Sequence, residues 1–175
     1  MESLGVDVGG VLIVPDDEVE DTSFFGANYL RTPAMPDAFA GLAALVRDRF
    51  GERVHLVSTC SESTERRTRE WLAHHDFYAR TGVAPRHVHF VRTREAKAPV
   101  AASLGLTHFV DDKLEVLSYL VTVAHRFLFH PRTQEIAAHR ARLAGVRRVE
   151  TWPELVSALL PGAGEQVAGL EEQLG

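Results

Sequence analysis

The sequence has a single cysteine, and it lacks both a basic N-terminal flank and a long apolar run. One thiol, Cys60, cannot close an internal disulfide and is typical of a reducing compartment, so we expect a cytoplasmic protein. The apolar stretch from Val8 to Val14 is far shorter than the ~20 residues of a membrane span, and no secretory signal precedes it. We therefore predict no membrane partner.

Positive charge is also scarce, because 19 Lys and Arg residues face 24 Asp and Glu residues and give a formal net charge of -5. This total implies no basic face, and we predict no nucleic-acid partner. Arginine fills most cationic positions, so the two lysines, Lys97 and Lys113, stand out. A chain of 175 residues, 45% of them apolar, suits one globular domain and is too short for two catalytic lobes.

Short apolar runs rich in β-branched residues alternate with segments of helical periodicity. The runs predict strands at residues 4–14, 54–57, 88–91, 107–110, 126–129 and 146–149. The helical spacing predicts helices at residues 36–50, 62–75, 99–104, 114–123, 134–143 and 152–160. Two helix starts have capping-box spacing, Thr59 with Glu62 and Thr151 with Glu154.

This alternation requires right-handed crossovers that cover both faces of a parallel sheet. The expected fold is therefore α/β, a three-layer α/β/α sandwich with a parallel Rossmann-like sheet. We expect one domain over residues 1–160 and a flexible tail over residues 161–175, which is rich in Gly, Glu and Gln. A site in such a fold is expected at the carboxyl ends of the strands.

Polar side chains stand at the ends of successive predicted strands or at the helix start that follows: Asp7, Ser58 with Thr59, Lys97, and Asp111 with Asp112. Taken alone, an Asp in a Gly-Gly turn often caps backbone N–H groups, and Ser or Thr often caps a helix. Lys97 asks for another explanation, because the dipole of a helix gives a cation no advantage at the helix start. The paired carboxylates repel one another unless a cation or water compensates them, which suggests Mg²⁺.

In chain order, this Asp, Ser, Lys and Asp-Asp pattern resembles the haloacid dehalogenase (HAD) superfamily over residues 4 to about 130. Response-regulator receivers place the acidic pair first, and actin-like kinases, which share the Asp-x-Gly-Gly start, need two lobes. The resemblance implies a Mg²⁺-dependent HAD-like hydrolase. It also implies metal ligation by Asp7, by the backbone carbonyl of Gly9 and by Asp112, with Asp111 helping directly or through water.

The resemblance further implies a phosphatase in which Asp7 attacks phosphorus and forms an aspartyl-phosphate. Lys97 and Mg²⁺ would offset the charge of the transferring group, and Ser58 would hydrogen-bond one of its oxygens. The substrate-binding residues would then be Gly9, Gly10, Ser58, Thr59 and Lys97.

Gly9 departs from the family pattern, because phosphatases of this superfamily usually have a second Asp there that protonates the leaving group. General acid catalysis typically contributes ~10²–10⁴ in rate. Four alternatives remain open. The leaving group needs no proton, as in an acyl phosphate; the reaction is of the phosphonate- or halide-cleaving kind; another acid substitutes; or the fold is a catalytically silent binding or regulatory module. The candidate substitutes are His130 and the loop acids Asp16, Asp17 and Glu18.

Only residues 15–36 separate the first motif from the first predicted core helix, which is too short for a large cap. The resemblance therefore implies a minimal-cap member in which this segment is either a solvated loop or a short flap over the site. Capless members tend to act on large substrates or to close the site with another subunit. We therefore expect a phosphorylated substrate. Whether this substrate is a macromolecule, and whether the protein forms an oligomer, are both left open. The next predicted helix has a basic group that we interpret as a solvated face, Arg66, Arg67 and Arg69.

Overall fold

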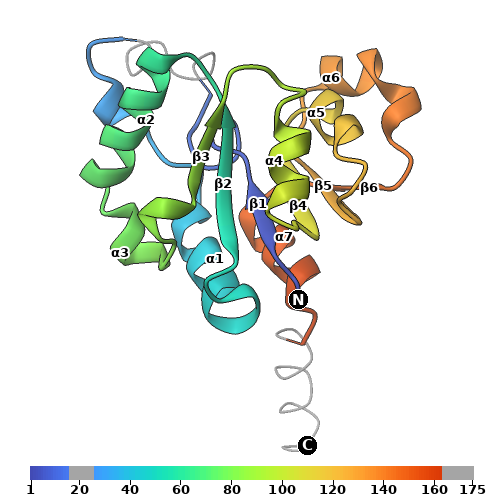
Figure 1. Cartoon of the computed structure of the whole chain (residues 1–175), viewed down its shortest axis with the longest axis horizontal. Helices are drawn as coiled ribbons and strands as arrows, with labels where there is room; N and C mark the ends of the chain where they lie inside the picture. The colour runs from blue at the N-terminus through green and yellow to red at the C-terminus, as the bar shows by residue number, and fades with distance from the viewer. Residues whose placement is uncertain (16–25, 163–175) are drawn as a thin grey trace, which may run out of the picture.

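The computed structural model describes residues 1–15 and 26–162 of the chain. Six parallel strands form one sheet with helices on both faces (Figure 1), which confirms the expected α/β sandwich with a parallel Rossmann-like sheet. The strands are β1 (Leu4–Val6), β2 (Val54–Thr59), β3 (Val88–Val91), β4 (His108–Asp111), β5 (His125–Phe129) and β6 (Val146–Val149).

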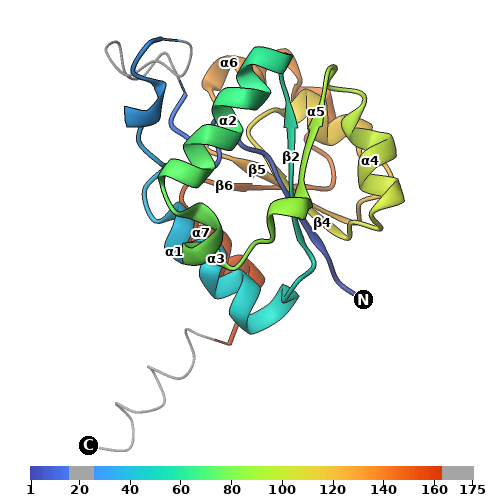
Figure 2. The same cartoon turned by 60° about the vertical axis from the view of Figure 1, so that its left-hand side comes forward.

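Two groups of helices cover opposite faces of this sheet (Figure 2). The first group is α1 (Ala38–Leu45), α2 (Glu62–His74), α3 (Phe77–Thr81) and α7 (Trp152–Leu159). The second group is α4 (Lys97–Ser103), α5 (Leu114–Tyr119) and α6 (Thr133–Ala138). A π-helical turn, η4 (Val46–Phe50), extends α1, and three 3-10 turns lie in the connections: η3 (Tyr29–Arg31), η5 (Pro85–His87) and η6 (Arg140–Arg142).

The strands supply side chains to two cores, because successive residues point to opposite faces of a sheet. Leu4 and Val6 of β1 pack with Trp71 on the α1 and α2 face, whereas Phe109 of β4 belongs to the core under α4 and α5. Full burial of such side chains contributes about 1.5–3 kcal/mol each. Gly5 lies against the second core, where a Cβ would approach the Phe109 ring to 2.4 Å, so the close strand packing requires glycine.

The strand order is β3-β2-β1-β4-β5-β6, so the chain moves outward from β1 to β3 and then crosses back to β4. Ligands of open parallel sheets bind outside the carboxyl ends of the strands at such a switch point. β1 and β4 pair through Val6 and Val110, and Asp7 and Asp111 are the next residues along each strand direction. The topology thus places these two carboxylates at the switch point.

The largest difference from the predicted elements follows β1. The predicted strand over residues 4–14 ends at Val6, and a tight turn follows in which the Val8 carbonyl accepts three backbone hydrogen bonds. The indole of Trp152 fixes this turn by donating to the Val11 carbonyl at 2.8 Å. The prediction was wrong because a short apolar run has the same pattern whether it is a buried strand or a buried turn.

The two predicted helix caps have different outcomes. The Thr59 cap is wrong, because the hydroxyl of Ser61 accepts the hydrogen bond from the Thr64 backbone N–H at 3.3 Å, and Thr59 ends β2 instead. The Thr151 cap is confirmed, since its hydroxyl accepts from the Glu154 backbone N–H at 3.2 Å. Helix α3 was not predicted, and the other helices differ from the predictions mainly at their ends.

Within residues 26–36, the described part of the predicted flap, η3 packs against α2 (Figure 1), and residues 33–35 pair with the turn after β1. The indole of Trp71 donates to the Thr32 carbonyl at 2.9 Å, and a ring nitrogen of His75 contacts the Leu30 carbonyl oxygen at 2.8 Å. The loop acids Asp16, Asp17 and Glu18 and residues 163–175 of the predicted tail lie outside the described residues. Within the described ranges, no helix is long and apolar enough to cross a membrane.

Candidate functional site

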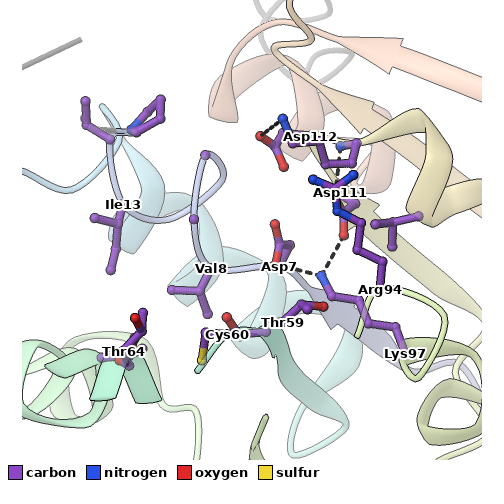
Figure 3. Close-up of a pocket in the computed structure, with 18 of the residues that line it drawn as sticks. Asp7, Val8, Ile13, Thr59, Cys60, Thr64, Arg94, Lys97, Asp111 and Asp112 are labelled. Carbon is purple, nitrogen blue, oxygen red and sulfur yellow. Dashed lines mark hydrogen bonds and ion pairs between the residues drawn. The ribbon is translucent and has the colours of Figure 1, made fainter. Parts of the chain in front are cut away.

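A cavity of about 580 Å³ opens at the carboxyl ends of the central strands (Figure 3). This volume lies within the range of small-molecule sites. All the residues that the sequence predicted for the site line this cavity: Asp7, Gly9, Gly10, Ser58, Thr59, Lys97, Asp111 and Asp112. The four distant motifs therefore converge in space.

Lys97 is the centre of the polar network in this cavity. Its Nζ donates to Asp7 Oδ1 at 2.7 Å and to Asp111 Oδ2 at 2.8 Å, and the residue is only 2% exposed. Burial by itself lowers the pKa of Lys97, but the carboxylates of Asp111 and Asp7 outweigh this effect and raise the pKa above its ordinary value. The lysine is therefore charged at neutral pH although it is buried.

The three aspartates crowd around one point. One carboxylate oxygen from each of Asp7, Asp111 and Asp112 lies within 4.8 Å of those of the other two. Burial and the negative charge of Asp7 raise the pKa of Asp111, although Lys97 acts in the opposite direction. Burial, Asp7 and Asp111 together raise the pKa of Asp112 well above its ordinary value. Full ionisation of the cluster is thus unfavourable unless further positive charge is supplied.

Hydrogen bonds divide these carboxylates into two kinds. Both oxygens of Asp111 are engaged, Oδ2 by Lys97 and Oδ1 by the backbone N–H of Lys113 at 2.9 Å. Asp7 accepts from Lys97 through Oδ1, and the nearest cation to Asp112 Oδ2 is Lys113 Nζ at 3.8 Å. Asp7 and Asp112 therefore offer the less committed oxygens, while Asp111 holds the lysine. Such an all-oxygen donor set fits a hard divalent cation, Mg²⁺ or Ca²⁺.

The two adjacent glycines have different structural roles. Gly10 has φ +79°, and a Cβ there would lie 2.3 Å from Asp112 Oδ2, so both the turn and the carboxylate require glycine. A Cβ on Gly9 would meet no atom within 4 Å, and its φ lies outside the left-handed region. Neither backbone strain nor packing excludes a side chain at position 9, and the space beside Asp7 is open there.

Two hydroxyl groups at the end of β2 complete the lining, on Ser58 and Thr59. Thr59 Oγ1 is buried and finds no hydrogen-bond partner among the described residues. A buried polar group without a partner costs about 1–3 kcal/mol.

The sequence did not predict three basic residues of the lining, which are Arg94, Lys113 and Arg132. Each follows the end of a strand, β3, β4 or β5, in the same way as the predicted site residues. Position directly after a strand was therefore the available signal. Arginine is so common in this chain that residue type alone does not single out Arg94 or Arg132.

The structure does not bring the other candidates to the cavity. His130 is absent from the lining, and its Nδ1 faces Glu150 Oε2 at 3.4 Å on the side of β6. All nine histidines lie in the described ranges, and none of them lines the cavity. The arginines of α2 also lie outside the lining; Arg69 pairs with Glu65 at 3.2 Å, as expected for a solvated face.

No protein-family model matches the chain, and a search of curated proteins found no match either. The chemistry of the cavity must therefore be interpreted from its own geometry and from the order of its motifs.

Proposed function

We propose that this chain is a Mg²⁺-dependent HAD-like hydrolase, a phosphatase that acts through an aspartyl-phosphate on Asp7. The observation that carries the proposal is the buried Lys97, whose Nζ contacts both Asp7 and Asp111 at the topological switch point. A buried cation in contact with two carboxylates can orient them and offset the negative charge of a group that is being transferred. The order of these residues along the chain, which resembles the HAD superfamily, is the second support.

The residues at the switch point fit the metal that the resemblance implies. Asp7, Asp112 and the backbone carbonyl of Gly9 would hold Mg²⁺, and Asp111 would keep Lys97 in place. Bound Mg²⁺ would supply positive charge that polarises the phosphoryl group and offsets charge in the transition state. The convergence of three carboxylates within 4.8 Å, with raised pKa values at Asp111 and Asp112, supports a cation between them.

In the proposed reaction an oxygen of Asp7 attacks phosphorus, and the bond from phosphorus to the leaving group breaks. Lys97 orients the Asp7 carboxylate and offsets charge on the transferring group. The hydroxyls of Ser58 and Thr59 donate hydrogen bonds to phosphoryl oxygens. Water then hydrolyses the aspartyl-phosphate, which releases inorganic phosphate and restores Asp7.

The leaving group must depart without help from residue 9, because Gly9 offers no acid, and no histidine lines the cavity in the described part of the chain. An acyl phosphate or an aryl phosphate satisfies this condition, since its leaving group is a stable anion. An alkyl phosphate does not satisfy it, and its hydrolysis should be slower by about the 10²–10⁴ that general acid catalysis contributes.

Turnover of acetyl phosphate, p-nitrophenyl phosphate, glycerol phosphate and a phosphonate with and without Mg²⁺ tests the proposal. We expect Mg²⁺-dependent release of phosphate from the first two and loss of that activity in Asp7→Asn. The open space at position 9 admits a carboxylate, so Gly9→Asp should accelerate hydrolysis of the alkyl ester. Equal activity of wild type and Asp7→Asn would contradict the proposal.

One observation favours a second candidate, a catalytically silent module that binds metal and a phosphorylated ligand. The cavity contains Lys97 and the carboxylates proposed to bind metal, but residue 9 is a glycine and supplies no acid. This candidate predicts Mg²⁺-dependent binding of a phosphonate, together with no turnover of any substrate in the panel. The same assays therefore separate the two functions.

A further inference from the structure

The cavity has two chemically different walls. The first is lined by the cations Arg94, Lys113 and Arg132, which come from the loops after β3, β4 and β5. In Figure 3, Arg94 lies beside Asp111 and Lys97, whereas the opposite side holds Val8, Ile13, Cys60 and Thr64, none of which is charged at neutral pH. The charges of Arg94 and Lys97 thus lie across the space next to Asp7 from an uncharged side.

These three cations are not the ones that hold the nucleophile. Lys97 makes the short contacts to Asp7 and Asp111, whereas Lys113 Nζ lies 3.8 Å from Asp112. Arg94 is held by an ion pair with Glu115, a residue outside the lining, so its guanidinium is fixed at the rim. The side chains of Lys113 and Arg94 remain 29% and 48% exposed, and Arg132 is also exposed, so a ligand can reach them.

The strand order separates Arg132 from the point of attack. β5 is two strands away from β1, and neighbouring strands lie about 4.8 Å apart, so the loop of Arg132 starts about 10 Å from the strand of Asp7. The cavity of about 580 Å³ is larger than a phosphoryl group at Asp7 requires, and it is large enough for a whole small molecule. Arg132 therefore faces a different part of the substrate from the phosphoryl group, and Lys113 comes from the loop of the intervening strand β4.

We propose that the substrate is a small molecule with a second anionic group, a carboxylate or another phosphate, which Lys113 and Arg132 bind while Asp7 attacks the phosphoryl group. Arg94, which lies beside Asp111 and Lys97 in Figure 3, adds a third cation to the lining. Charge-assisted hydrogen bonds from lysine and arginine are the ordinary means of binding such groups. The inference rests on the proposed function, and it narrows the substrate class from phosphorylated molecules in general to doubly anionic small molecules.

Three phosphonates that resist hydrolysis test the subsite: propylphosphonate, 4-phosphonobutyrate and propane-1,3-bisphosphonate. Their affinities are measured by calorimetry on the full chain at one fixed free Mg²⁺ concentration. Either second anion should tighten binding about tenfold or more, and the stronger of the two identifies a carboxylate or a phosphate subsite. In Lys113→Gln/Arg132→Gln this gain should disappear while propylphosphonate binds within about threefold of wild type.

Arg86→Gln is the matched control, because it removes the same charge from an exposed arginine in η5, which precedes β3 and is absent from the cavity lining. It should leave all three affinities unchanged. Equal affinities of the three ligands for wild type would overturn the subsite and leave the proposed function standing. An equal loss for all three ligands in the double variant would also overturn it, since the cations would then bind the phosphoryl group itself. Failure of every phosphonate to bind would overturn the proposed function as well.

Discussion

Replacement of Lys97 by methionine tests whether one buried cation holds the acidic cluster together. Methionine keeps an unbranched apolar side chain and removes the ammonium group, so the loss is mainly electrostatic. Asp111, which is 0% exposed, and Asp7, at 8%, would each lose a hydrogen-bonded cation. Removal of one partner from a buried ion pair costs about 3–5 kcal/mol. For a chain of this size, that cost lowers the Tm of the metal-free protein by roughly 6–20 °C.

The cause of this loss is identified by a second substitution, Asp111→Asn, in the Lys97→Met background. It removes a buried charge that has lost its partner, so about 1–3 kcal/mol should return. Urea unfolding in EDTA, followed by both fluorescence and circular dichroism, measures the free energies of unfolding and checks two-state behaviour. Lys113→Met is the control; its side chain is 29% exposed and 3.8 Å from Asp112, so the cost should stay below about 1 kcal/mol. A cost below about 1 kcal/mol for Lys97→Met, or strict additivity in the double variant, would refute the reasoning.

Three further predictions concern the metal, the glycine turn and pH. Millimolar Mg²⁺ should raise the Tm of wild type by several degrees but not that of Asp112→Asn, which calorimetric scans would show. Gly10→Ala should cost about 1–2 kcal/mol and weaken Mg²⁺ binding, whereas Gly9→Ala should do neither; chemical unfolding and metal titration compare them. Burial and neighbouring positive charge lower the pKa of His55 and of His108 to about 4. Because the unfolded chain binds these protons first, the two histidines destabilise the fold as pH drops from about 6.5 toward 4, whereas Asp111 and Asp112, whose pKa values are raised, act in the opposite direction. A Tm series should therefore show wild type losing stability relative to His55→Gln over this interval.

The alternation of apolar runs and helical segments was enough to predict a parallel sheet with two covered faces, and β3 and β6 begin and end at the predicted residues. The run from Val8 to Val14 was predicted as strand because burial alone produces an apolar run. Its conformation depends on contacts that are distant in sequence, such as the hydrogen bond from Trp152 to Val11. Helix α3 begins after Asp76 at φ 53°, a start that no capping pattern in the sequence indicates.

The members of the site were predictable because strand ends of a parallel sheet meet at one edge. The resemblance also implied that Asp112 binds metal and that Asp111 assists, but it did not imply that Asp111 holds Lys97. Asp111 is the last residue of β4 and shares the face of Phe109, the face covered by α4, so it meets Lys97. Asp112 lies just beyond the strand, where the register no longer fixes its direction. Residue type alone does not distinguish two adjacent aspartates. In the same way Arg94 and Arg132 were hidden among many arginines, whereas Lys113 stood out as one of two lysines but was not predicted for the site.

The Gly9-Gly10 pair shows how the structure changes the meaning of a sequence motif. Both residues are consistent with a sharp turn, yet only Gly10 is required by its φ and by the carboxylate of Asp112. Gly9 is free to carry a side chain, so the turn does not explain why an acid is missing next to Asp7. The same open space lies next to Asp7, the proposed nucleophile, in a cavity whose charged groups are cations or the carboxylates proposed to bind metal. A leaving group that departs as an anion suits this environment, because the positive charge around it takes the place of a proton.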